Sequence, residues 1–66
     1  MEHFQDAIKE LMDVKGLSQE KLAHILGVNQ TTVSKWLLGR IKPGYDHILA
    51  FYEKFGIEPN ELFGIK

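Results

Sequence analysis

The feature that most constrains the fold of this chain is the helical spacing of its apolar residues. These residues lie in short segments, most of which end at a glycine. A short amphipathic helix can bury its apolar side only against other helices, so the segments must pack on one another. The glycines that end the first four segments are Gly16, Gly27, Gly39 and Gly56. Pro59 opens a short fifth segment that runs through Phe63. Because strand signals are absent, the sequence predicts an all-α domain of five helices over residues 1–66.

Polar residues mark the starts of these helices. Ser18 and Asn29 precede the second and third segments, and both are favoured N-caps because their side-chain oxygen accepts an N–H of the first turn. Gly44 precedes the fourth segment and is a weaker cap by roughly a few tenths of a kcal/mol. We therefore expect side-chain caps at the second and third helices.

The composition excludes several classes of protein. The chain has no cysteine, no apolar run near the roughly 20 residues of a membrane span and no secretory leader, which indicates a cytoplasmic protein with no membrane partner. His3, His24 and His47 lie too far apart for a metal pair at helical spacing. No nucleophile–base pair or phosphate loop is present, and so small a domain has little room for an enclosed pocket. We expect no enzyme activity, cofactor or small-molecule ligand.

The charges are unevenly distributed along the chain. All nine acidic residues lie outside segment 21–45, which carries +4 while the rest of the chain carries −5 and the whole chain −1. Its cations are Lys21, Lys35, Arg40 and Lys42. Local field matters more than net charge when a protein approaches a polyanion. The segment also contains Asn29-Gln30-Thr31-Thr32, whose amides and hydroxyls can read base edges. This pattern predicts DNA binding.

The second and third segments fit a helix-turn-helix. Seven residues occupy its buried or sterically restricted positions, namely Leu22, Ala23, Leu26, Gly27, Val28, Val33 and Trp36. Ala23 must be small because the third helix crosses close to it, and Gly27 permits the positive φ of the turn. Val33 and Trp36 anchor the third helix on the core, which leaves its other face free.

The whole chain resembles the Cro/phage-repressor helix-turn-helix family, often called the XRE family. The residues that carry this resemblance lie in segments 17–23, 26–36, 39–43 and 55–62. The resemblance implies a five-helix, lambda-repressor-like bundle that binds double-stranded DNA as a transcriptional regulator. We expect sequence-specific binding through the major groove, and repression rather than activation.

The resemblance also implies roles for eight residues at the DNA. Gln19 looks like the glutamine with which the family clamps a phosphate. The base-reading positions are matched by Gln30, Thr31 and Lys35. Phosphate contacts or secondary readers are matched by Thr32, Ser34, Arg40 and Lys42. Their chemistry agrees, because a glutamine amide can bond adenine bidentately and cations neutralise phosphates.

Four positions depart from the family's pattern, one of them Gly44, which replaces the usual Ser cap of the fourth helix. Met12 and Leu37 stand where members often pair an arginine with a glutamate, and an apolar pair can replace a buried ion pair without loss of stability. Leu38 stands where many members carry a polar residue that bonds a phosphate, which removes one expected contact.

The last third of the chain is rich in apolar side chains, namely Tyr45, Phe51, Tyr52, Phe55, Ile57, Phe63 and Ile65. They exceed what one small helix pair readily buries, so we expect a weak homodimer through the fourth and fifth helices, on a two-fold operator. The same surplus fits a second interpretation, in which the fold is a protein-interaction module such as an antitoxin-like or regulator-binding partner. The initial Met1 and the end after the fifth helix favour a complete protein over the DNA-reading part of a longer one.

Overall fold

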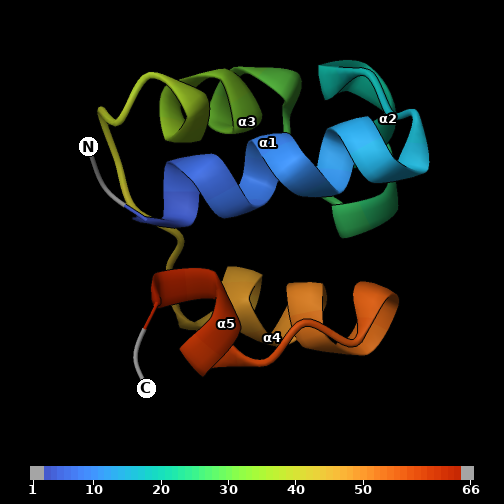
Figure 1. Cartoon of the computed structure of the whole chain (residues 1–66). Coiled ribbons are helices and arrows are strands. Elements are labelled where there is room, and N and C mark those ends of the chain that lie inside the picture. Colours follow the sequence, from blue (N-terminus) through green and yellow to red (C-terminus); the bar gives the residue numbers. More distant parts are fainter. Residues whose placement is uncertain (1–2, 65–66) are drawn as a thin grey trace.

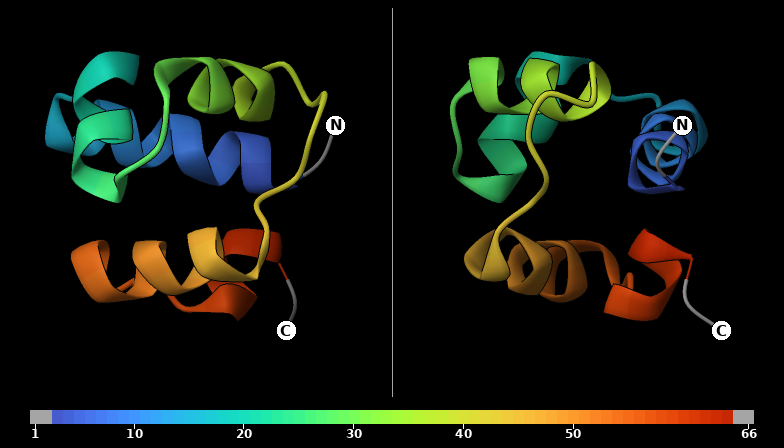
Figure 2. Two further views of the ribbon diagram at one scale, coloured as in Figure 1. Left: turned by 180° about the vertical axis from the view of Figure 1, so that it is seen from behind. Right: turned by 90° about the vertical axis from the view of Figure 1, so that its left-hand side faces the viewer.

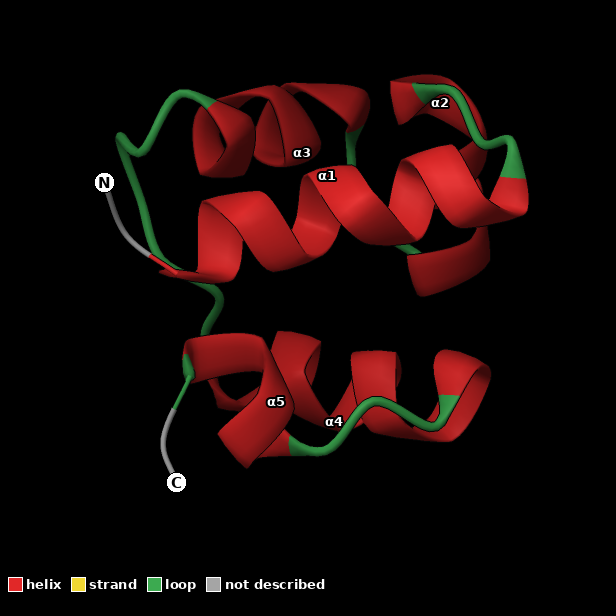
Figure 3. Cartoon of the chain, in the orientation of Figure 1, coloured by secondary structure: helices red, strands yellow, loops and turns green. Residues whose placement is uncertain are grey.

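The computed structural model describes residues 3–64, which form five α-helices and no strand (Figures 1 and 3). They are α1 (His3–Lys15), α2 (Gln19–Leu26), α3 (Gln30–Leu37), α4 (Tyr45–Phe55) and α5 (Pro59–Phe63). The predicted all-α class is confirmed. Within residues 3–64, every helix is too short or too polar to pass through a lipid bilayer.

The helices form two layers, with α1, α2 and α3 on one side and α4 and α5 on the other (Figures 1 and 2). In the first layer, α3 packs against both α1 and α2. Between the layers, α4 contacts α2 and α5 contacts α1. The last contact brings the first and last helices together, with the ring centroids of Phe4 and Phe63 6.3 Å apart. The arrangement leaves α2 and α3 at one side of the molecule.

The core lies between the layers, and every helix contributes to it. The largest fully buried side chains are Trp36, Phe4, Phe51, Ile8, Leu22, Leu62 and Val33. The Trp36 ring of α3 contacts Phe51 and His47 of α4, with ring centroids 5.5 and 5.2 Å away. Met12 and Leu37, which stand where members of the family that the sequence resembles often pair an arginine with a glutamate, both pack against this core. The core therefore fixes one side of α3.

Gly27 builds the turn between α2 and α3 with a φ of 73°, which side chains other than glycine rarely adopt. The Gly27 N–H donates to the His24 carbonyl at 3.2 Å, and the Val28 N–H donates to the Ala23 carbonyl at 2.9 Å. These two bonds end α2 and redirect the chain into α3. Ala23 itself is buried. The predicted left-handed turn at Gly27 is confirmed.

The helix starts agree with the sequence in part. The Ser18 hydroxyl accepts the Lys21 N–H at 3.1 Å, as predicted. Asn29 occupies the N-cap position of α3, but its side chain makes no capping bond, so the predicted side-chain cap was wrong. The Asn29 carbonyl instead accepts the Thr32 N–H at 3.0 Å. Because the Asn29 side chain is exposed, water can satisfy its amide as well as the helix could.

The start of α4 has a feature that the sequence did not reveal. The Gly44 N–H donates to Nδ1 of His47 at 3.2 Å, so a side chain in the first turn binds the N-cap backbone. The same imidazole lies edge-on to the buried Trp36 ring. His47 thus holds the start of α4 against α3. Among residues 3–64, no cluster of histidine and carboxylate side chains could hold a metal ion.

Candidate nucleic-acid interface

Helix α3 has one buried side and one exposed side. Val33 and Trp36 are 0% exposed, whereas Gln30, Thr31 and Lys35 are exposed. Thr31 and Lys35 are four residues apart and therefore lie on the same side of the helix. No acidic residue occurs in α3. The exposed side therefore offers an amide, a hydroxyl and an ammonium group, without a carboxylate that would repel DNA.

The start of α2 is joined to the middle of α3 by a side-chain hydrogen bond. The Ser34 hydroxyl donates to Oε1 of Gln19, with the two oxygens 2.5 Å apart. Both side chains are half-buried at the contact between the two helices. The structure therefore places Gln19 beside the exposed side of α3, although it lies eleven positions before Gln30 along the chain.

The end of α3 is fixed by a glycine and by α1. The N–H groups of Gly39 and Arg40 donate to the Trp36 and Lys35 carbonyls at 3.0 and 2.9 Å. From α1, Nε2 of Gln5 donates to the Leu37 carbonyl at 3.1 Å. These bonds set where the chain leaves α3 and enters the basic connection to α4.

The eight predicted contact residues fall into two groups in the structure. Those that are exposed are Gln30, Thr31, Lys35, Arg40 and Lys42. Those that are half-buried are Gln19, Thr32 and Ser34. The structure brings Gln19, the α3 residues and the connection that begins at Arg40 into one stretch of surface around α3. The DNA-contacting role of each residue stays a prediction.

Leu38 follows α3 with 66% of its surface exposed, and the nearby Ile41 is exposed as well. Neither side chain can bond a phosphate. The polar contact that many family members make at this position is therefore missing here, as the sequence indicated.

Sequence reasoning missed Gln5, which is a buried polar side chain among the core residues of α1. Its signal was present but weak: Gln5 is three and seven residues from Ile8 and Met12, which places it on the apolar side of the helix. The bond between Ser34 and Gln19 had no sequence signal, because it depends on how closely α2 and α3 pack.

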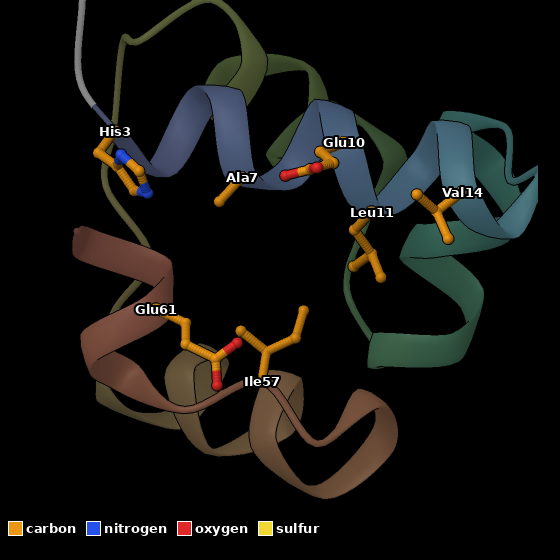
Figure 4. A pocket seen from close by; sticks show the side chains of 7 residues that line it. All are labelled: His3, Ala7, Glu10, Leu11, Val14, Ile57 and Glu61. Carbon is orange, nitrogen blue, oxygen red and sulfur yellow. The ribbon is translucent and has the colours of Figure 1, made fainter.

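A hollow of about 240 Å³ lies between α1 and α5, away from α2 and α3 (Figure 4). Its lining residues are His3, Ala7, Glu10, Leu11, Val14, Ile57 and Glu61. The carboxylates of Glu10 and Glu61 turn toward it (Figure 4). Small-molecule sites usually occupy roughly 300–1,000 Å³, and two carboxylates would repel a phosphate. This hollow is therefore no part of a DNA interface.

Helices α2 and α3 are joined at a left-handed glycine, and one side of α3 is buried while the other is exposed and free of acidic residues. These features define a helix-turn-helix domain of DNA-binding type. A family model described as helix-turn-helix matches residues 8–62. The chain belongs to this family, in its Cro/phage-repressor (XRE) type.

One curated relative carries the name HTH-type transcriptional activator BcrR and comes from Enterococcus faecalis. It is 32% identical to this chain over 59 residues, which cover 89% of the chain and 29% of the relative. The chain therefore spans less than a third of the relative's length. No solved structure shows a significant match.

Proposed function

We propose that this chain binds a specific sequence of double-stranded DNA and regulates transcription, with α3 in the major groove. The observation that carries the proposal is the exposed, acid-free side of α3, which is presented by a helix-turn-helix whose other side is fixed in the core. Membership of the helix-turn-helix family supports it. The name of the relative, a transcriptional activator, supports regulation as the outcome.

Base reading falls to the first two turns of α3. The Gln30 amide can donate to and accept from adenine N6 and N7, and the Thr31 methyl can contact a thymine methyl. Lys35, one turn further, can donate to guanine O6 or N7. We assign the backbone contacts to Gln19, Thr32, Arg40 and Lys42, whose amide, hydroxyl and cationic groups suit phosphate oxygens.

Repression, which we expect from the sequence, and activation, which the name of the relative states, both need the same DNA complex. A reporter with the selected site placed over or upstream of a promoter distinguishes them. Selection of bound sequences from a random DNA pool supplies that site.

The central test distinguishes residues that contact bases from residues that contact phosphates. We expect Gln30→Ala to cost about 1–3 kcal/mol on the preferred sequence and to relax preference at one base pair, because it removes a base contact. Arg40→Ala should weaken all sequences alike and reduce the log–log salt slope by about one, because it removes one phosphate neutralisation. Fluorescence anisotropy of labelled duplexes at several salt concentrations measures both.

Lys54→Ala is the matched control, because Lys54 is an exposed cation on α4, outside the proposed interface. It should leave affinity and salt slope unchanged. Equal losses for Gln30→Ala and Arg40→Ala on preferred and random sites would contradict the division into reader and clamp. If wild-type protein showed no salt-sensitive binding, the alternative of a protein-interaction module would be favoured instead.

A homodimer on a two-fold operator is the second part of the proposal. Tyr45, Leu49 and Tyr52 are 74%, 40% and 52% exposed, and their spacing places them on one side of α4, which we call the α4 stripe. The other apolar side chains expected to be in surplus are buried or pack against the core, namely Phe51, Phe55, Ile57 and Phe63. Ile65 lies outside the described residues. The α4 stripe, rather than α5, therefore offers the apolar surface for a second copy.

A further inference from the structure

Ser34 lies on α3, the proposed reading helix, but its hydroxyl proton is already donated in a hydrogen bond within the protein. The hydroxyl donates to Oε1 of Gln19 at 2.5 Å. Both side chains are half-buried, so this bond is partly shielded from competing water. Ser34 therefore has no proton left to donate to a phosphate unless this bond breaks.

The bond also determines which group Gln19 presents to the outside. A glutamine amide has one acceptor oxygen and an NH₂ group with two donors. Ser34 bonds the oxygen, whereas the amide nitrogen has no partner among residues 3–64. Phosphate oxygens only accept hydrogen bonds, so they match the two N–H donors of this nitrogen.

We propose that Ser34 is a positioning residue, which orients the Gln19 amide so that its NH₂ group faces a DNA phosphate. The bond joins α2 to α3, so the Gln19 amide at the start of α2 is oriented only when α3 packs against α2. This role rests on the proposed DNA binding and adds to it a coupling between the two helices. It differs from the role expected for Ser34 from the sequence, which was a direct contact with a phosphate or secondary base reading.

The two roles predict different energetic couplings. If Ser34 acts through Gln19, its removal matters only while Gln19 is present. If Ser34 bonds the phosphate directly, its removal costs the same affinity with or without Gln19. A double-mutant cycle measures this difference.

The experiment compares Ser34→Ala, Gln19→Ala, the double variant and Ser34→Thr in DNA-binding titrations on preferred and random duplexes. We expect Ser34→Ala to weaken binding by about two- to ten-fold on every sequence, the size of one net hydrogen bond, without a change in salt slope. Combined with Gln19→Ala it should add no further loss. Ser34→Thr keeps the hydroxyl and should restore affinity.

A second measurement uses the protein without DNA. In side-chain amide NMR spectra, the Gln19 NH₂ signals should have chemical shifts away from those of a free glutamine and relaxation typical of a rigid side chain in wild-type protein and in Ser34→Thr. In Ser34→Ala they should move toward the free-glutamine shifts and relax as a mobile side chain does. Thermal unfolding of each variant identifies any loss that comes from the fold alone.

Three results would overturn the proposal. They are an undiminished Ser34→Ala loss in the Gln19→Ala background, unchanged DNA affinity of Ser34→Ala, and unchanged Gln19 signals in Ser34→Ala. Each of the first two requires that wild-type protein binds DNA, so they leave the proposed function intact. Absence of DNA binding by wild-type protein would instead remove the proposed function together with the role of Ser34.

Discussion

Two constraints meet at Gly39, two residues beyond the end of α3. Its φ of 74° lies in the left-handed region, and a Cβ there would lie 2.8 Å from Nε2 of Gln5. That same nitrogen donates to the Leu37 carbonyl, so Gln5 cannot move aside without giving up the bond. A single residue thus fixes both the direction of the chain toward Arg40 and the contact between α1 and α3.

Gly39→Ala should therefore destabilise the domain more than alanine does at Gly16, Gly27 and Gly56, the left-handed glycines whose Cβ positions have nothing within 4 Å. The left-handed backbone alone costs an alanine roughly 1–2 kcal/mol, and the contact with Gln5 adds to it. Gly16→Ala is the matched control, because its φ is 65° and nothing lies within 4 Å of its Cβ position. Urea unfolding gives both free energies, and equal losses would show that Gln5 exerts no steric restriction.

For single residues, the sequence predicted which side chains are buried or exposed better than it predicted their hydrogen bonds. The spacing of Val33 and Trp36 was sufficient to identify the buried side of α3, because helical periodicity is a local property. The bonds of Ser34 and Gln5 were missed, because each joins two helices and depends on their packing.

At the scale of the elements, α2 and α3 have the same length but start differently. Ser18 caps α2 with a side-chain bond, whereas the Asn29 side chain leaves α3 without one. The positions of both helix starts were predictable, because cap residues act locally. The absence of the Asn29 bond was not predictable, since it depends on a side-chain rotamer at an exposed site.

We expect Ser18→Ala to lower the free energy of unfolding by about 0.5–2 kcal/mol, because the Lys21 N–H loses its acceptor. Asn29→Ala makes a matched comparison at the next helix and should cost much less, because no side-chain bond is lost. Thermal or urea unfolding checks both variants. An equal cost would mean that the Asn29 side chain caps α3 in solution.

At the scale of the whole molecule, the exposed apolar residues are unequally distributed. Three of them form the α4 stripe, while Val14 stands on α1 with 73% of its surface exposed. The sequence indicated a surplus in the last third of the chain, but could not separate core from surface there, because aromatic residues suit both. Packing assigns Phe51 to the core and Tyr52 to the surface.

Tyr52→Glu should weaken self-association by about ten-fold or more, because a carboxylate within an apolar contact would be desolvated. In analytical ultracentrifugation the variant should then sediment as a monomer. Its binding to DNA with two half-sites should lose cooperativity. Val14→Glu places the same charge on α1 and should change neither. Monomeric wild-type protein at high concentration would contradict the proposed dimer.

The contact between α1 and α5 also bears on the order in which the domain assembles. The Phe4 and Phe63 rings meet across almost the whole described chain, so forming this contact closes a loop of nearly that length. The turn at Gly27 joins α2 to α3 with only three residues between them. Short-range contacts of this kind form quickly, whereas long loops are entropically costly to close. We therefore expect the α2–α3 pair to form early in folding, and the joined ends to close last and open first.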